Sequence, residues 1–340
     1  MFFLLFCLFT GDEGWVRNDL ELFGLTHLTQ APNGDIFVLD SPDHYVIHLS
    51  ASGQTLGTFG GEGSGPGEFC RAINIMSDAD YVYVDDARNG RIQVFNHQGE
   101  FSETITTPEP YTKPLKIMGG WIYQTRPDDD QKACLMVAND HFEYPTELLS
   151  WVSMSEKRTR ATGCIVPRAI NPAPNNPCLV VSPTGDRAYF YKPGLKFEVF
   201  IIDGVNLEIT STIVEDSPLT PLDKEWAEKK INRRSERDQA RVESSIKPST
   251  FYPEYFPPVA KLSIGPDGLL YVTPGTRWYD GSHHYAYTLD GTPQGRSSAY
   301  SRRHDVYYKP GWVVSQSYDE KDGMQVQVKP FTSKSRLRRH

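Results

Sequence analysis

Two stretches of the chain decide the fold: residues 34–40, which read GDIFVLD, and residues 80–86, which read DYVYVDD. The likeness continues on both sides of them at one fixed spacing. The matched pairs are Phe37 and Tyr83, Asp40 and Asp86, Leu49 and Phe95, and Gly53 and Gly99, each pair 46 residues apart. A constant spacing over four pairs indicates a repeated structural unit.

Each unit predicts four short antiparallel strands. An apolar strand and a polar turn lead to the aromatic strand that ends in Asp40 or Asp86, and an alternating strand then runs to a glycine turn. Residues 54–59 and 101–105 supply the fourth strands. Four strands in a repeat of about 40–50 residues is the spacing of one blade of a β-propeller.

The pattern recurs with drift downstream. Residues 262–272 and 179–189 repeat the strand–turn–strand device, and 115–123 and 306–314 are weaker copies that turn through glycine. The six units begin near residues 26, 70, 112, 177, 258 and 303. The sequence therefore predicts an all-β fold, a six-bladed β-propeller built from four-stranded antiparallel blades.

The two ends of this ring are predicted to meet. Residues 20–24 (LELFG) are similar to residues 56–60 (LGTFG), the last strand of the first unit, yet they precede that unit. The final unit stops one strand short, after 324–331. We therefore expect the strand around Leu22 to complete the last blade and close the ring.

Two motifs resemble a known family. Residues 63–69 (GSGPGEF) and 86–95 (DARNGRIQVF) are similar to an NHL repeat, and the proline-led segment 255–258 resembles bacterial six-bladed propellers of the NHL/TolB-like kind. The resemblance implies a six-bladed β-propeller and a structural role for Arg91 in the blade turn. It implies no single activity, because one fold carries many functions.

The chain divides into three parts. Residues 1–14 open with MFFLLFCLF, which resembles the apolar part of a truncated secretory signal, and residues 332–340 form a basic tail predicted to be disordered. Residues 15–331 form the propeller, with a densely charged insertion at 216–257 that predicts helices between blades 4 and 5. The expected location is secreted or periplasmic. Cys164 and Cys178 fit either a disulfide or two reduced cysteines.

Composition excludes some functions. The 340 residues carry a net charge of −8, which disfavours nucleic-acid binding, and no apolar run approaches the length of a membrane span. We expect a monomer whose partner is a protein or a small polar or anionic ligand.

Candidate binding residues follow from the propeller geometry. Loops that enter the first strand of each blade, and loops between second and third strands, gather on one face around the central channel. They place these residues at that entrance: His27, Arg71, Lys113, Lys261, Arg303, His304, Arg277 and Trp278. Several cations in an acidic protein favour an anionic group, although pairing with nearby aspartates would explain them equally well.

The sequence thus predicts a binding or scaffold module without catalytic residues or a cofactor. The alternative is a propeller lyase or hydrolase that holds a divalent metal in the channel through His27, Asn74 or His304. No nucleophile elbow and no complete phosphate-binding loop is present in the sequence.

Overall fold

The computed structural model describes residues 14–20, 22, 26–109, 112–130, 132–152, 178–216, 219–223, 225, 255–275, 284–297, 305–306, 312–319 and 323–330. Within these ranges the regular structure consists of 24 β-strands. They form six antiparallel sheets of four strands each, which confirms the all-β prediction.

Five sheets are built from strands consecutive in the chain. They are β2 (Thr26–Gln30), β3 (Ile36–Asp40), β4 (Tyr45–Leu49) and β5 (Thr55–Gly60); β6 (Ala72–Ser77), β7 (Tyr81–Asp86), β8 (Arg91–Asn96) and β9 (Phe101–Thr106); β10 (Leu115–Ile117), β11 (Gly120–Gln124), β12 (Lys132–Ala138) and β13 (Thr146–Val152); β14 (Cys178–Val181), β15 (Arg187–Tyr191), β16 (Phe197–Asp203) and β17 (Glu208–Glu215); and β18 (Lys261–Ile264), β19 (Leu270–Thr273), β20 (His284–Tyr287) and β21 (Pro293–Ser297). The sixth combines β22 (Asp305–Val306), β23 (Trp312–Asp319), β24 (Gly323–Pro330) and β1 (Trp15–Arg17).

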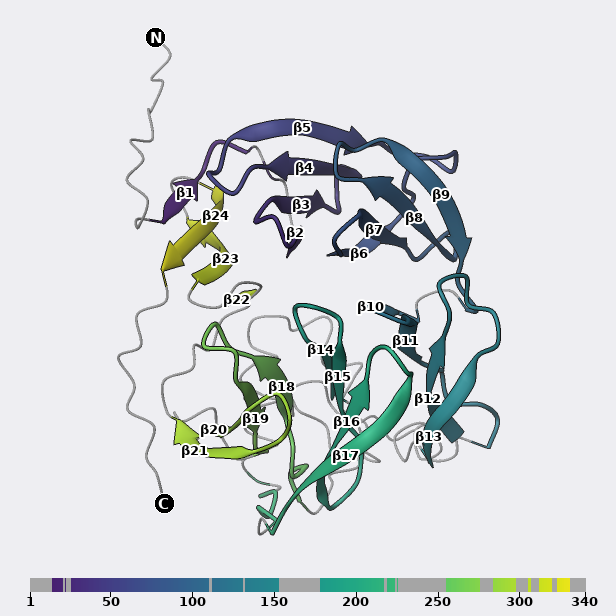
Figure 1. Ribbon diagram of the computed structural model, residues 1–340, viewed down its shortest axis with the longest axis vertical. Helices are drawn as coiled ribbons and strands as arrows, with labels where there is room; N and C mark the ends of the chain where they lie inside the picture. The colour runs from purple at the N-terminus through teal and green to yellow at the C-terminus, as the bar shows by residue number, and fades with distance from the viewer. Residues whose placement is uncertain are drawn as a thin grey trace.

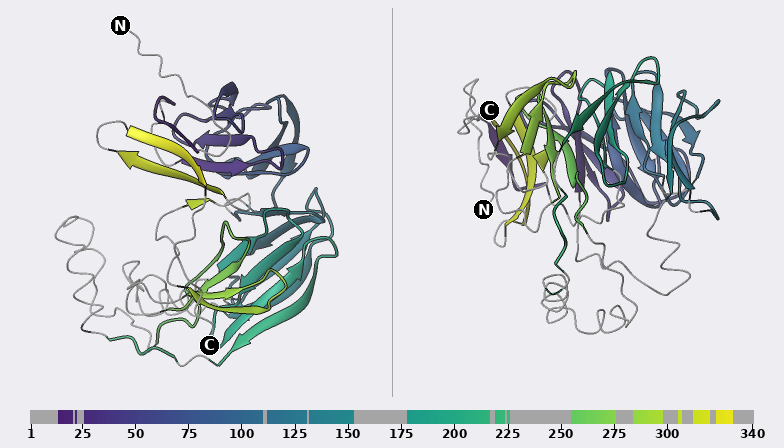
Figure 2. Two further views of the ribbon diagram at one scale, coloured as in Figure 1. Left: turned by 60° about the vertical axis from the view of Figure 1, so that its left-hand side comes forward. Right: turned by 90° about the horizontal axis from the view of Figure 1, so that it is seen from below.

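The sheets stand side by side around a common centre, with the first strand of each sheet innermost (Figures 1 and 2). Strands follow the order of the chain from the centre outward. This is the topology of a β-propeller. The inner strands begin close to the predicted unit starts, at residues 26, 72, 115, 178, 261 and 305.

Apolar packing between the faces of neighbouring sheets forms the core. One cluster joins the first and second sheets through Phe37, Phe69 and Val84, and another joins the second and third through Tyr83 and Trp121. Similar clusters link the third sheet to the fourth, the fourth to the fifth and the sixth to the first. No core cluster of the described residues links the fifth sheet to the sixth, so full closure of the ring stays a prediction.

The N-terminal strand joins the last sheet, but it is not the strand that the sequence predicted. β1 pairs with β24, with Trp15 opposite Val328 and Arg17 opposite Val326. Leu22 lies outside any strand and packs against the cluster between the sixth and first sheets. The prediction that an N-terminal strand completes the last sheet is confirmed, but its residues were wrong, because Leu20 and Leu22 pack against the same cluster without belonging to a strand.

A recurring contact with glycine explains why Trp15 takes this position. Gly53 has a φ of +83°, and a Cβ there would lie 2.8 Å from the indole of Trp15. Gly99, its counterpart one repeat later, packs in the same way against Phe59 of β5. β1 therefore sits against the first sheet as β5 sits against the second, and the Trp15 indole N–H also donates to the Ala51 carbonyl at 3.0 Å.

The predicted helical insertion, 216–257, lies for the most part outside the described residues. Its base is described: Pro221 and Tyr255 form an antiparallel bridge, and the Phe256 amide donates to the Thr220 carbonyl at 2.9 Å. The segment between them thus leaves and rejoins the fold at one place. Among the described residues, we find no helix with the length and hydropathy needed to cross a bilayer.

We predict that Trp15→Ala lowers the free energy of unfolding by about 3 kcal/mol, because it removes a 7 % exposed aromatic side chain and its hydrogen bond. Urea denaturation followed by circular dichroism measures the change. Val16→Ala is the matched control, since Val16 lies on the same strand and is 43 % exposed, and it should cost less than about 0.5 kcal/mol. Equal losses for both variants would contradict the anchoring role of Trp15.

Candidate ligand-binding site on the entry face

The entry face is the side of the molecule on which the inner strands begin. Arg71 directly precedes β6, Lys113 lies two residues before β10, and Lys261 is the first residue of β18. All three side chains are exposed. Because the sheets share one strand order, the starts of their inner strands lie on the same side.

Lys113 acts electrostatically on His27, although the two residues belong to the sheets on either side of the second sheet. His27 lies on β2 of the first sheet, whereas Lys113 leads into the third. Desolvation lowers the pKa of the His27 imidazole, and the positive charge of Lys113 lowers it further. His27 is exposed, yet the protein around its imidazole removes enough water to disfavour the charged form. His27 is therefore neutral at pH 7, a hydrogen-bonding group beside a cation.

Lys113 keeps its charge available. Its φ of +51° places it in the left-handed region, at the end of the connection from β9. No carboxylate among the described residues forms an ion pair with it. Lys116, three residues later, differs in that its Nζ lies 2.8 Å from Asp140 Oδ1. Within the described ranges, Lys113 shows no ion pair like that of Lys116, although its charge acts on the buried Asp85.

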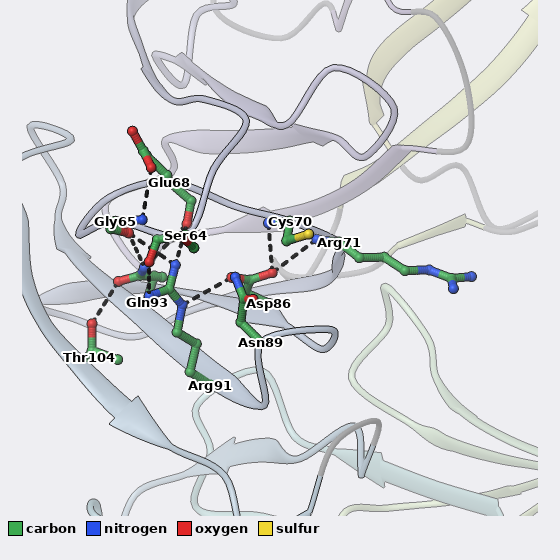
Figure 3. A network of polar contacts seen from close by, with 10 residues as sticks. All are labelled: Ser64, Gly65, Glu68, Cys70, Arg71, Asp86, Asn89, Arg91, Gln93 and Thr104. Atoms are coloured by element: carbon green, nitrogen blue, oxygen red, sulfur yellow. Dashed lines mark hydrogen bonds and ion pairs between the residues drawn. The ribbon is translucent and has the colours of Figure 1, made fainter.

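A buried aspartate fixes the backbone next to Arg71 (Figure 3). Asp86 Oδ1 accepts hydrogen bonds from the amides of Cys70 and Arg71 at 2.9 and 3.0 Å. Its Oδ2 accepts from the Asn89 side chain at 2.7 Å and from Arg91 Nε at 3.0 Å. The Arg71 side chain extends away from this network (Figure 3). Asp86 thus fixes the backbone from which the Arg71 side chain projects.

Arg91 holds the loop that leads to β6. Its guanidinium donates to the Ser64 carbonyl at 2.8 Å and to the carbonyls of Gly65 and Glu68 at 3.0 Å each. Gln93 adds donations to the same two carbonyls, and Thr104 in turn donates to Gln93 (Figure 3). The structural role expected for Arg91 is confirmed.

Asp85, which the sequence analysis overlooked, is the most unusual group near this face. Its residue is 2 % exposed, and its Oδ2 is buried without a hydrogen-bond partner. Burial first, and then the charge of Asp86, raise the pKa of Asp85 to about 7, whereas Lys113 lowers it. Asp85 lies two residues after Tyr83 on β7, so the two side chains point to the same face of the sheet. Tyr83 packs against the third sheet, and Asp85 therefore faces that sheet too.

Four of the predicted site residues, Arg277, Trp278, Arg303 and His304, lie outside the described residues. The described ranges contain no group of three His, Cys, Asp or Glu side chains able to hold a metal ion. Of the residues expected to hold a metal ion, His27 and Asn74 are described and His304 is not. Cys164 is likewise not described, so the pairing with Cys178 stays untested.

Comparison with known proteins leaves the family open: no family model and no curated protein matches the chain. Among solved structures, a candidate exported protein from Bacteroides fragilis aligns over 98% of this chain and 92% of its own, with 12% identity and a TM-score of 0.49. A virginiamycin B lyase from Staphylococcus aureus aligns over 95% and 90%, with 11% identity and a TM-score of 0.41. A streptogramin B lyase aligns over 95% and 89%, with 11% identity and a TM-score of 0.42.

We expect Arg91→Lys to lower the free energy of unfolding by about 2–4 kcal/mol, because an ammonium group cannot replace the planar set of donations to Asp86 and three carbonyls. Chemical denaturation gives the value. Arg88→Lys, an exposed arginine of the same turn, should stay within about 0.5 kcal/mol of the parent protein. A stable Arg91→Lys protein would show that the network is dispensable.

The Asp85 carboxyl should make the folded state less stable as the pH rises. In the unfolded chain it ionises near pH 3.8, whereas in the folded protein it stays protonated until about pH 7. Its contribution is complete below the lower value and is lost as the pH rises to the upper one. Asp85→Asn should therefore stabilise the protein by roughly 2–4 kcal/mol at about pH 8 and change it little at about pH 4. Denaturation curves at both pH values test this, and a gain of equal size at both would contradict it.

Proposed function

We propose that the protein is a ligand-binding β-propeller that recognises a polar or anionic partner at its entry face. The observation that carries the proposal is that Lys113 acts electrostatically on His27 and that both residues, like the exposed Arg71, lie at or next to the start of an inner strand. A neutral imidazole, an ammonium group and a guanidinium together suit an oxyanion such as a carboxylate, sulfate or phosphate.

We further propose that the six sheets form a closed six-bladed propeller of the NHL/TolB-like kind. It comprises residues 15–331 and works as a monomer. Its repeat spacing and the pairing of β1 with β24 support this. The apolar start of the chain supports a secreted or periplasmic location, with 216–257 as a helical insertion and 332–340 as a tail. Arg277, Trp278, Arg303, His304 and Lys261 belong to the same binding face.

A binding role is favoured over metal-dependent catalysis. The lyase or hydrolase alternative requires several ligands converging on one ion, and His27 and Asn74 are its described candidates. Lys113 acts against such a site, because its positive charge near His27 repels a divalent cation. The geometry therefore supports the capture of negative charge.

Sulfate binding tests the proposal. Isothermal titration of sulfate at about pH 6.5 and constant ionic strength should show one site, and Lys113→Gln should weaken it at least fivefold, since an attraction of about 1 kcal/mol is removed. Lys329→Gln is the control, because this exposed lysine carries the same charge and lies near the end of β24. That strand runs parallel to β22, so its end points away from the side on which the inner strands begin. Equal weakening in both variants would reduce the effect to net charge and contradict the proposed site.

A further inference from the structure

Asp85 and Lys113 lie at the same end of neighbouring sheets. Asp85 is opposite Asn74 near the start of β6, Lys113 leads into β10, and β6 and β10 are in contact. The charge of Lys113 stabilises the Asp85 carboxylate and disfavours protonated His27. One lysine thus acts both on an exposed imidazole from the first sheet and on a buried carboxyl from the second. Any ligand that neutralises Lys113 must change the proton affinity of both groups.

The surroundings of Asp85 allow its carboxyl, rather than that of the neighbouring Asp86, to gain or lose a proton. Asp86, the next residue on β7, is a second carboxylate, but it accepts four hydrogen bonds from Cys70, Arg71, Asn89 and Arg91. On the side of the third sheet, Lys113 is the charged group that acts on Asp85. β8 places the apolar Ile92 opposite Asp85, and β6 places the neutral Asn74 opposite it. With Oδ2 unpartnered, Asp85 is the carboxyl of the pair that can take up a proton at little cost.

We propose that Asp85 makes oxyanion binding at the entry face proton-linked, so that its Oδ2 takes up one proton from solvent when an oxyanion occupies the site of Lys113, His27 and Arg71. This inference rests on the function proposed above. The oxyanion cancels the charge that keeps Asp85 ionised, and the second negative charge near it further favours the neutral acid. By reciprocity, protonation of Asp85 strengthens oxyanion binding by the same factor.

The direction of the pH dependence follows. Above about pH 7, Asp85 is ionised in the unliganded protein and repels the ligand, and below it the group is neutral. Affinity therefore falls as the pH rises through this range. His27 is the competing group. Its pKa is lowered in the unliganded protein, and an oxyanion that neutralises Lys113 would raise it, so the His27→Gln variant is needed to separate its contribution from that of Asp85.

Sulfate is the probe, because its own charge does not change over the range tested. We would titrate sulfate into the full chain by calorimetry at about pH 6.5, 7.5 and 8.5, in two buffers that differ in ionisation enthalpy. The parent protein should bind roughly tenfold more weakly at the highest pH than at the lowest, with net proton uptake near pH 7.5. Asp85→Asn should bind with nearly constant affinity and without proton uptake, whereas His27→Gln should bind more weakly but keep the pH dependence.

A second measurement does not depend on any variant folding correctly. In the ¹³C-labelled parent protein, NMR titration of the Asp85 carboxyl should give a midpoint that moves upward by about one pH unit when sulfate saturates the site. Sulfate binding without pH dependence, or a midpoint that sulfate does not move, would overturn the proton linkage and leave the proposed function standing. An absence of sulfate binding at every pH would overturn both.

Discussion

Burial of both faces of each four-stranded sheet is the constraint on which this structure depends. The second strands show it most clearly, since every residue of β3 and every residue of β7 after its first is buried. A sheet buried on both faces needs a neighbour on each side, and a ring of sheets meets that need without a separate covering layer. Polar chemistry is then confined to the strand ends and their connecting segments, which is where Arg71, Lys113 and the aspartates of β7 are found.

The repeat was predictable because its signals are local in the chain. Asp40 and Asp86 end equivalent strands and both are completely buried, and the glycines at 53 and 99 face aromatic rings in the same way. Arg91 was identifiable because its partners lie in the neighbouring loop motif at 63–69. Where a turn, a glycine and a buried strand recur at one spacing, the repeat and the order of its strands can be predicted from the sequence.

Other features depend on contacts that the repeat does not encode. The strand completing the sixth sheet is held by Trp15 against Gly53, so resemblance to residues 56–60 pointed to the wrong segment. Asp85 was overlooked because an aspartate beside Asp86 suggests a turn. The available signal was its position two residues after Tyr83 on the same strand, which turns its side chain toward the third sheet rather than toward solvent. The coupling of His27 to Lys113 crosses 86 residues of chain and follows only from the arrangement of the sheets.

The base of the segment between the fourth and fifth sheets has a bearing on how this scaffold tolerates change. Pro221 and Tyr255 bridge its two ends, and Thr220 and Phe256 close the bridge with a backbone hydrogen bond. Ends fastened together in this way make the intervening length almost irrelevant to the strands beside it. The segment between Pro221 and Tyr255 can therefore be lengthened, shortened or exchanged while the sheets on either side keep their strand registers.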